Sequence, residues 1–154
     1  MTRLSAGLLL HREGGEDGLE VLLAHMGGPF WAKKDERAWS VPKGEYAEGE
    51  EPLAAAYREF AEEMGRPAPE GRVVDLGQVR QSGKVVTCFA LAADFDAARI
   101  SSNTFTLEWP PRSGRTEEFP EVDRAEWFGL AAARLKLVKG QVPFLDRLVE
   151  AVRG

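Results

Sequence analysis

Cysteine, histidine and long apolar runs are scarce in this sequence, and their scarcity excludes several classes of protein. Cys88 is the single cysteine among 154 residues, which excludes a disulfide framework and a cysteine-based zinc site. The apolar runs are far shorter than a membrane span, and Leu8–Leu10 is too short for the core of a signal peptide. We therefore expect a cytoplasmic protein with no membrane partner.

An excess of positive charge is also absent. The chain has 25 acidic and 20 basic residues, which gives a formal net charge of −5. Such a surface does not favour bulk binding to nucleic acid, so we expect no nucleic-acid partner. No repeat or linker interrupts the sequence, and its length fits one domain over residues 1–154. The oligomeric state cannot be predicted from these features.

A core helix with an acidic stripe is predicted within the segment Gly44–Gly65. Pro52 suits the first helical turn, and Gly65 begins a stop signal. The predicted apolar face consists of Leu53, Ala56, Tyr57, Phe60 and Met64. The acids on another face, at spacings i, i+3 and i+4, are Glu59, Glu62 and Glu63. Their carboxylates lie within reach of one another.

This stripe occupies the unfavourable end of the helix. The carboxyl end carries the negative pole of the helix dipole, where each anion costs about a few tenths of a kcal/mol. Arg58 can offset part of the repulsion through Glu62, but one arginine cannot neutralise three carboxylates. Clustered carboxylates are the hard ligands that Mg²⁺ or Mn²⁺ prefers, and the alternative is a solvated acidic face.

The loop before this helix adds a spacing that resembles the Nudix box. The spacing is Gly44, five residues, Glu50, seven residues, Arg58-Glu59, Phe60, one residue, Glu62-Glu63, one residue and Gly65. Arg66 departs from the family pattern, which prefers an aliphatic residue there. The resemblance implies an α/β (α+β) fold, an α/β/α sandwich with a mixed β-sheet between helices. It also implies a Nudix pyrophosphohydrolase, which cleaves a nucleoside diphosphate linked to another group.

The resemblance further implies a metal site and catalytic groups. Glu59, Glu62 and Glu63, with the backbone at Gly44, are the expected ligands of Mg²⁺, and Mn²⁺ is the alternative ion. Arg58, Glu59 and Glu62 are catalytic candidates from the helix. The general base stays open between Glu59 and an acid of the 110–121 loop. Glu121 is the first choice from that loop, and Glu118 is the second.

The expected substrate is a small nucleotide. The run Trp39–Glu45 resembles the approach to the box in Nudix enzymes acting on dinucleoside polyphosphates and inositol pyrophosphates, which makes Trp39 and Lys43 candidate contacts. In the 27–37 loop, Trp31 and Lys33 combine an aromatic ring with a cation, which suits a stacked base and a polyphosphate. The alternative is a solvated loop whose aromatic residues pack on the core.

Lys84 begins a predicted strand and is either a phosphate contact or a solvated turn residue. We expect a dinucleoside polyphosphate or a nucleoside triphosphate as the substrate. ADP-ribose, an inositol pyrophosphate, or a non-catalytic nucleotide-sensing module are the alternatives.

The remaining pattern predicts a mixed set of strands and helices. Residues 110–120 are expected to form a long loop, and His11 and His25 to be partly exposed structural residues at strand ends. The predicted strands cover residues 5–11, 19–25, 38–42, 73–81, 84–93, 103–109 and 121–128, and the closing helices cover 129–136 and 142–153.

Overall fold

The computed structural model describes residues 2–153. Its strands are β1 (Arg3–Glu13), β2 (Leu19–Met26), β3 (Trp39–Ser40), β4 (Lys43–Glu45), β5 (Arg72–Gln81), β6 (Lys84–Ala92), β7 (Thr104–Glu108), β8 (Thr116–Pro120) and β9 (Val122–Gly129). Its helices are α1 (Pro52–Met64), α2 (Leu130–Lys136), the 3₁₀ helix η1 (Lys139–Gln141) and α3 (Pro143–Arg153).

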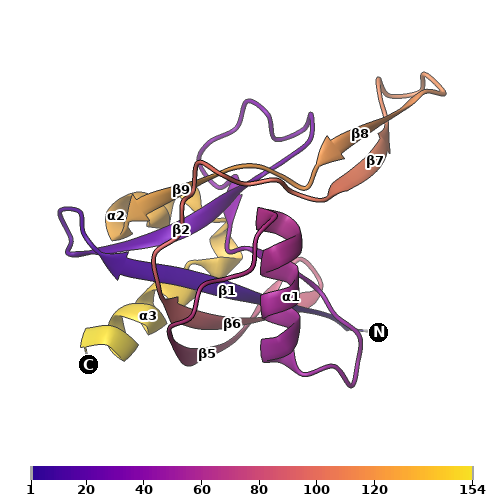
Figure 1. Ribbon diagram of the computed structural model, residues 1–154. Helices are drawn as coiled ribbons and strands as arrows, with labels where there is room; N and C mark the ends of the chain where they lie inside the picture. The colour runs from indigo at the N-terminus through magenta and orange to yellow at the C-terminus, as the bar shows by residue number, and fades with distance from the viewer. Residues whose placement is uncertain (1, 154) are drawn as a thin grey trace.

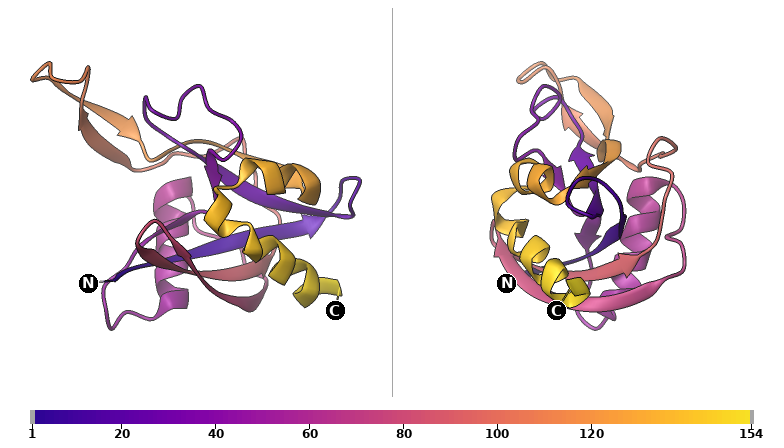
Figure 2. Two further views of the ribbon diagram at one scale, coloured as in Figure 1. Left: turned by 180° about the vertical axis from the view of Figure 1, so that it is seen from behind. Right: turned by 90° about the vertical axis from the view of Figure 1, so that its left-hand side faces the viewer.

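Strand β1 is the centre of a mixed sheet (Figure 1). It pairs in parallel with β6 and antiparallel with β2 and β4, in the order β3-β2-β1-β6-β5, and β9 joins the sheet at β2. Helix α1 lies on one face of this sheet, and α2 and α3 lie on the other (Figure 2). The predicted sandwich with a mixed sheet between helices is confirmed.

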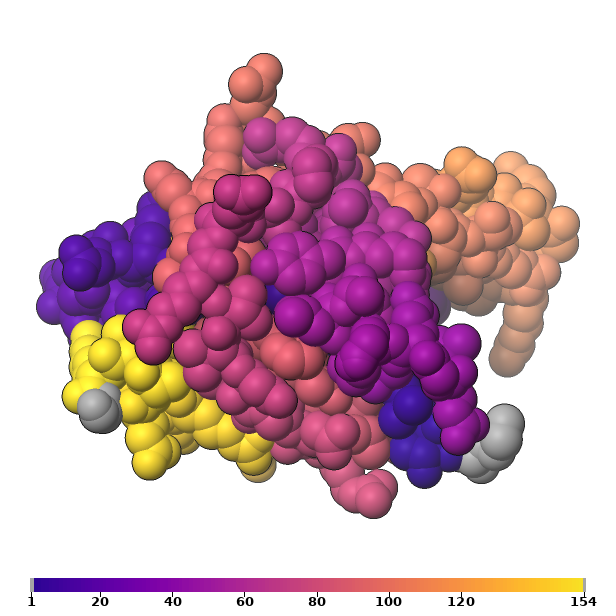
Figure 3. Space-filling view, turned by 60° about the horizontal axis from the view of Figure 1, so that its bottom comes forward, coloured from indigo at the N-terminus to yellow at the C-terminus, as the bar shows by residue number. Residues whose placement is uncertain are grey.

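Each face of the sheet carries its own hydrophobic core, because side chains alternate along β1. Leu8 and Leu10 belong to the core under α1, together with Phe60 of that helix. Leu9 belongs to the core on the other face, with Phe144 of α3. Figure 3 shows α3 lying against β5, on the face of the sheet opposite to α1.

Helix α1 has the bounds that the sequence predicts. It begins at Pro52, and Gly65 ends it in the left-handed conformation, with φ 77° and its N–H donating to the carbonyl of Ala61. Within the predicted apolar face, Ala56, Phe60 and Met64 are fully buried, and Leu53 and Tyr57 pack at the edge of the same core. The acidic stripe is thereby held at the end of the sheet.

The structure corrects the prediction that residues 110–120 form a loop. Thr116–Pro120 is strand β8, which pairs antiparallel with β7 to make a hairpin that stands clear of the main sheet (Figures 1 and 2). Sequence reasoning missed β8 because its residues are mostly exposed and show no apolar alternation. Phe119 of β8 packs against Phe105 of β7, with their ring centroids 6.0 Å apart.

Strand β4 was also not expected, because three residues are too few to show a period; its pairing with β1 defines it. His25 corrects another expectation, since it is fully buried rather than partly exposed. Within residues 2–153, the helices are all too short or too polar to cross a bilayer.

Candidate active site

A small polar pocket forms where α1 and β4 meet the amino-terminal ends of β1 and β6. Its volume is about 220 Å³, and its lining residues are Ser5, Lys43, Gly44, Glu45, Glu59, Glu63, Lys84, Asn103 and Glu121. A second cavity of about 120 Å³ shares Lys43, Glu63 and Glu121 and continues towards β2 and β3. The pocket therefore has an acidic wall of Glu59, Glu63 and Glu121 and a basic wall of Lys43 and Lys84.

Gly44 is required at its position because Glu59 occupies the space where a side chain would be. A Cβ atom on Gly44 would lie 1.9 Å from Oε2 of Glu59. Glu59 is only 9% exposed, so its carboxylate rests against the backbone of β4. Burial raises the pKa of Glu59, the charge of Glu62 raises it further, and Arg58 opposes both effects.

Glu63 is the second member of the acidic wall. Its Oε1 atom accepts a hydrogen bond of 3.1 Å from the backbone N–H of Lys43. Burial of the carboxyl raises the pKa of Glu63 to about 8, the charge of Lys43 lowers it, and Glu121 and Glu59 add to the rise. Burial therefore disfavours the Glu63 anion, and a cation bound beside the carboxylate would stabilise it.

Glu121 is brought to the same wall by a chain of backbone hydrogen bonds. The N–H of Asn103 donates to the carbonyl of Glu62 at 3.0 Å, and the N–H of Glu121 donates to the carbonyl of Asn103 at 2.8 Å. The carbonyl of Glu121 accepts from Gly27, where a Cβ atom would lie 1.9 Å from the carbonyl oxygen of Pro120. The base of the β7–β8 hairpin is thus anchored to α1, with Glu121 in the pocket.

Glu118, the second choice from this segment, lies on β8 opposite Thr106 and does not line the pocket.

Arg58 lies outside the pocket and holds the acids from the solvent side. Its Nη1 atom donates to Glu59 at 2.8 Å and lies 3.5 Å from Glu62, while its Nε and Nη2 atoms donate to the Glu50 carboxylate at 3.1 Å. Glu62 has a side chain that is 44% exposed and does not line the pocket. The structure brings Glu59, Glu63 and Glu121 together and leaves Glu62 at the rim.

The donor set fits a divalent cation, although no group of three acidic, histidine or cysteine side chains within residues 2–153 is arranged to enclose one. Arg58 and the backbone of Lys43 hold the carboxylates of Glu59 and Glu63. Carboxylate oxygens are what Mg²⁺ and Mn²⁺ prefer, and burial raises the pKa values of Glu59 and Glu63 in spite of Arg58 and Lys43. Gly44 leaves the space in which Glu59 reaches the pocket.

The basic wall consists of two lysines that face each other. Burial lowers the pKa of Lys43, and the neighbouring Lys84 lowers it further, while Glu63 opposes. Neither ammonium group makes an ion pair within 4.0 Å with any carboxylate of the described chain. The wall is therefore suited to an incoming anion with several oxygen atoms.

Comparison with known proteins identifies the family. A family model of the NUDIX domain matches residues 1–148. The chain belongs to the Nudix family. It is 31% identical over 129 residues to an RNA pyrophosphohydrolase of Brucella anthropi, covering 74% of this chain and 67% of that protein. These matches confirm the predicted enzyme class, a Nudix pyrophosphohydrolase.

Solved Nudix structures share the fold. The NUDIX domain of Shewanella oneidensis NrtR, in complex with ADP ribose, superposes with a TM-score of 0.65 at 18% identity, over 99% of this chain and 89% of that one. An Ap4A hydrolase of C. elegans gives a TM-score of 0.63 at 20% identity, over 97% and 98% of the two chains.

The predicted aromatic contacts lie away from this Nudix pocket. Trp39 is 1% exposed, with its indole N–H donating to Asp35 at 3.0 Å, so neither face of its ring is free to stack on a base. Trp31 packs against the same core, and Lys33 is exposed on the 27–37 loop. The Nε2 atom of His25 lies 2.7 Å from the carbonyl oxygen of Lys34, and this hydrogen bond fixes the loop to β2.

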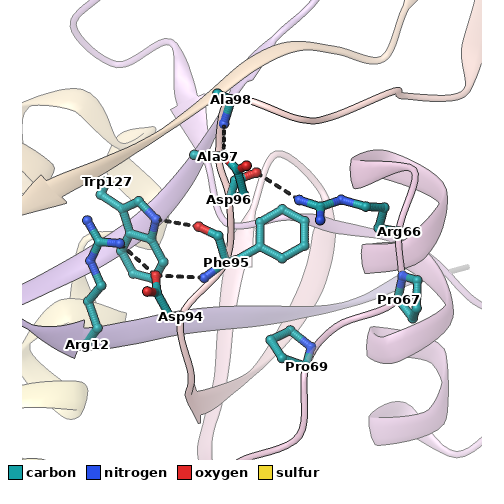
Figure 4. Close-up of a pocket in the computed structure, with 10 residues that line it drawn as sticks. All are labelled: Arg12, Arg66, Pro67, Pro69, Asp94, Phe95, Asp96, Ala97, Ala98 and Trp127. Carbon is teal, nitrogen blue, oxygen red and sulfur yellow. Dashed lines mark hydrogen bonds and ion pairs between the residues drawn. The ribbon is translucent and has the colours of Figure 1, made fainter.

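A wider groove of about 740 Å³ lies beyond the end of α1, and Figure 4 shows why its charges are structural. Arg66 donates to the carbonyls of Asp96 and Arg99 at 2.9 and 3.1 Å, and its guanidinium lies 4.4 Å from the centre of the Phe95 ring. On the other side, Arg12 binds Asp94 at 2.7 Å. Arg66, the departure from the Nudix box, therefore fastens the 94–99 segment to α1.

Sequence reasoning missed Ser5, Glu45 and Asn103 as pocket residues. No local pattern marks them, because the parallel pairing of β1 with β6 and the anchoring of the hairpin base bring them to the pocket.

Proposed function

We propose that this Nudix protein catalyses Mg²⁺-dependent hydrolysis of a phosphoanhydride bond in a nucleoside 5′-polyphosphate, with a dinucleoside polyphosphate or a nucleoside triphosphate as the substrate. The observation that carries this proposal is the pocket with three glutamates on one wall and two lysines on the other. A polyphosphate needs both walls, because its oxygen atoms are anionic and its attacked phosphorus must be reached by water. The predicted cytoplasmic location is part of this proposal.

The chain's own groups divide this work. Glu59, Glu63 and Glu121 would hold the divalent ion, which supplies charge neutralisation and a more acidic water when bound. Lys43 and Lys84 bind phosphoryl oxygens and keep the anhydride against the acidic wall. The carboxylates of Glu59 and Glu121 are the two candidates to accept the proton of the attacking water. Arg58 orients Glu59 through their 2.8 Å hydrogen bond.

The curated relative supports a second candidate substrate, the triphosphate at the 5′ end of an RNA. That relative is named an RNA pyrophosphohydrolase and is 31% identical to this chain. Such an end carries the same phosphoanhydride as a nucleoside triphosphate, so the pocket chemistry would be unchanged. It would require a nucleic-acid partner, which the net charge of −5 does not favour.

A substrate panel tests the proposal. The purified protein with Mg²⁺ would be given diadenosine tetraphosphate, nucleoside triphosphates, a 5′-triphosphorylated oligoribonucleotide, ADP-ribose and an inositol pyrophosphate, and products would be identified. We expect the fastest turnover with a polyphosphate. Glu63→Gln protein prepared in the same way controls for contaminating hydrolases. Turnover of ADP-ribose alone would contradict the proposed substrate class, and no turnover of any compound would contradict the function.

A further inference from the structure

Ser5 is fully buried, yet its hydroxyl group has no hydrogen-bond partner. The residue has 0% exposure, and among the buried side-chain nitrogen and oxygen atoms of residues 2–153 its Oγ alone is unpartnered. Such groups are rare in folded proteins, because the lost contact with water goes uncompensated. Ser5 also lines the pocket of about 220 Å³. The missing partner is therefore expected from a ligand in that pocket.

The register of the sheet places Ser5 with the two lysines of the basic wall. On β6, Lys84 is the parallel partner of Arg3, two residues before Ser5. On β4, Lys43 is the antiparallel partner of Gly7, two residues after Ser5. Since every second residue of a strand faces the same side and partners share a side, Ser5, Lys43 and Lys84 lie on one face, which is the face of Leu9 and not the face covered by α1. The acids of α1 line the same pocket from the other face, beside Gly44.

No carboxylate of residues 2–153 forms an ion pair with either lysine, although the charges of Glu63 and Glu45 act on Lys43 from a greater distance. Glu45, the β4 partner of Ser5, is bound by Arg3 at 2.6 and 2.9 Å. Glu63 directs Oε1 to the backbone N–H of Lys43. Two ammonium groups and a hydroxyl need an anion with several acceptor atoms, and a phosphoryl group has them.

The size of the pocket limits what can enter it. Small-molecule pockets usually measure roughly 300–1,000 Å³. A cavity of about 220 Å³ accommodates phosphoryl groups and leaves the nucleoside outside.

We propose that Ser5 Oγ donates a hydrogen bond to a third phosphoryl group, beyond the two that the cleaved anhydride joins, which Lys43 and Lys84 hold next to that anhydride. This inference rests on the proposed function and sharpens it. A substrate with a third phosphate next to the cleaved bond uses this subsite, whereas a nucleoside diphosphate sugar has no phosphate to place there. The preferred class is therefore nucleoside 5′-triphosphates and dinucleoside tetraphosphates.

Ser5→Ala tests the inference with a binding measurement that needs no turnover. Inorganic tripolyphosphate would be titrated into the metal-free protein in the presence of a chelator, and its dissociation constant obtained from the rise in melting temperature. We expect Ser5→Ala to weaken tripolyphosphate binding about tenfold or more, since one donor to an anion is lost. The melting temperature without ligand should not fall, because no protein hydrogen bond is removed.

Thr87→Val is the matched control. It deletes a buried hydroxyl on β6 that has a partner, the Nε2 atom of Gln78 at 3.3 Å, and that does not line the pocket. We expect Thr87→Val to lower the melting temperature and leave tripolyphosphate binding unchanged. If Ser5→Ala does not fold, Ser5→Cys keeps the volume with a weak donor and replaces it.

The outcomes separate this inference from the proposed function. Weaker tripolyphosphate binding in the Ser5 variant, with a raised KM for diadenosine tetraphosphate and little change in kcat, supports the subsite. Unchanged binding and KM overturn it, even if the parent hydrolyses the polyphosphate and the function stands. Weaker binding with no hydrolysis by the parent would support the phosphate subsite and contradict the proposed function.

Discussion

Two hollows near α1 differ in what their charged groups contact. In the groove of about 740 Å³, Arg12 and Arg66 are both engaged, by a carboxylate and by backbone carbonyls. In the pocket of about 220 Å³, Lys43 and Lys84 have no carboxylate within ion-pair distance among residues 2–153, and the hydroxyl of Ser5 has no partner. Unmet contacts, rather than size, therefore distinguish the pocket that we propose as the binding site.

The largest effect should come from the acidic wall of the smaller pocket. We expect Glu63→Gln to lower kcat by about two orders of magnitude, because it removes an anion from the proposed metal site. Glu62→Gln is the comparison variant on the same helix, and we expect it to lose less, since Glu62 lies at the rim with a 44% exposed side chain. Steady-state rates with saturating polyphosphate and Mg²⁺ give the comparison. Equal losses in both variants would show that the pocket does not distinguish these acids.

The basic wall should have a smaller effect of a different kind. Lys84→Met is expected to raise KM for the polyphosphate about tenfold with little change in kcat, because it removes one charge-assisted contact to a phosphoryl group. Lys33→Met, on the exposed 27–37 loop, serves as the control and should leave KM unchanged. A KM effect confined to Lys33→Met would move substrate binding to that loop.

Sequence reasoning predicted these walls unequally. The box spacing and the helical period grouped Glu59, Glu63 and Gly44, which line one pocket, because those residues share one helix and the loop before it. Glu121 was found only through the family resemblance, since a chain of backbone hydrogen bonds across the hairpin base brings it to the pocket. Ser5 was missed, because its environment depends on the parallel pairing of β1 with β6, which leaves no local pattern.

The predicted aromatic contacts lie outside the pocket for a related physical reason. A tryptophan in a loop or short strand has the same appearance in sequence whether its ring packs inward or faces a ligand. Trp39 packs inward, with Phe128 at 4.8 Å between ring centroids. Strand β8 was missed because its pairing with β7, rather than burial of its own residues, defines it.

The acidic wall also predicts a pH dependence of stability in the absence of metal. Burial raises the pKa of Glu63 from 4.5 to about 8, so the folded state favours the neutral carboxyl. The contribution of Glu63 to the free energy of unfolding is therefore complete below about pH 4.5 and is lost as the pH rises through about 8. Glu63→Gln has no such loss, so its melting temperature relative to the parent should increase from pH 5 to pH 9 in chelator. A constant difference across that range would contradict this prediction.

The smallest effect on activity should come from the larger groove. Arg66→Leu restores the aliphatic residue of the family pattern, removes two hydrogen bonds to carbonyls and one contact with Phe95, and should cost about 1–2 kcal/mol of stability. We expect kcat/KM to remain within about twofold of the parent, since the groove's charges are structural. Chemical denaturation and steady-state assays measure the two quantities. A large loss of kcat/KM in a stably folded Arg66→Leu protein would assign the groove to the reaction.

Metal binding is the decisive measurement, because we propose that a divalent ion is held by the wall formed by Glu59, Glu63 and Glu121. The measurement is the rise in melting temperature on adding millimolar Mg²⁺ or Mn²⁺ to the chelator-treated protein, compared between the parent and Glu63→Gln at one pH and ionic strength. We predict a rise that saturates with metal concentration in the parent and is largely absent in Glu63→Gln. Equal rises in the two proteins, or no rise in either, would contradict the proposed metal site.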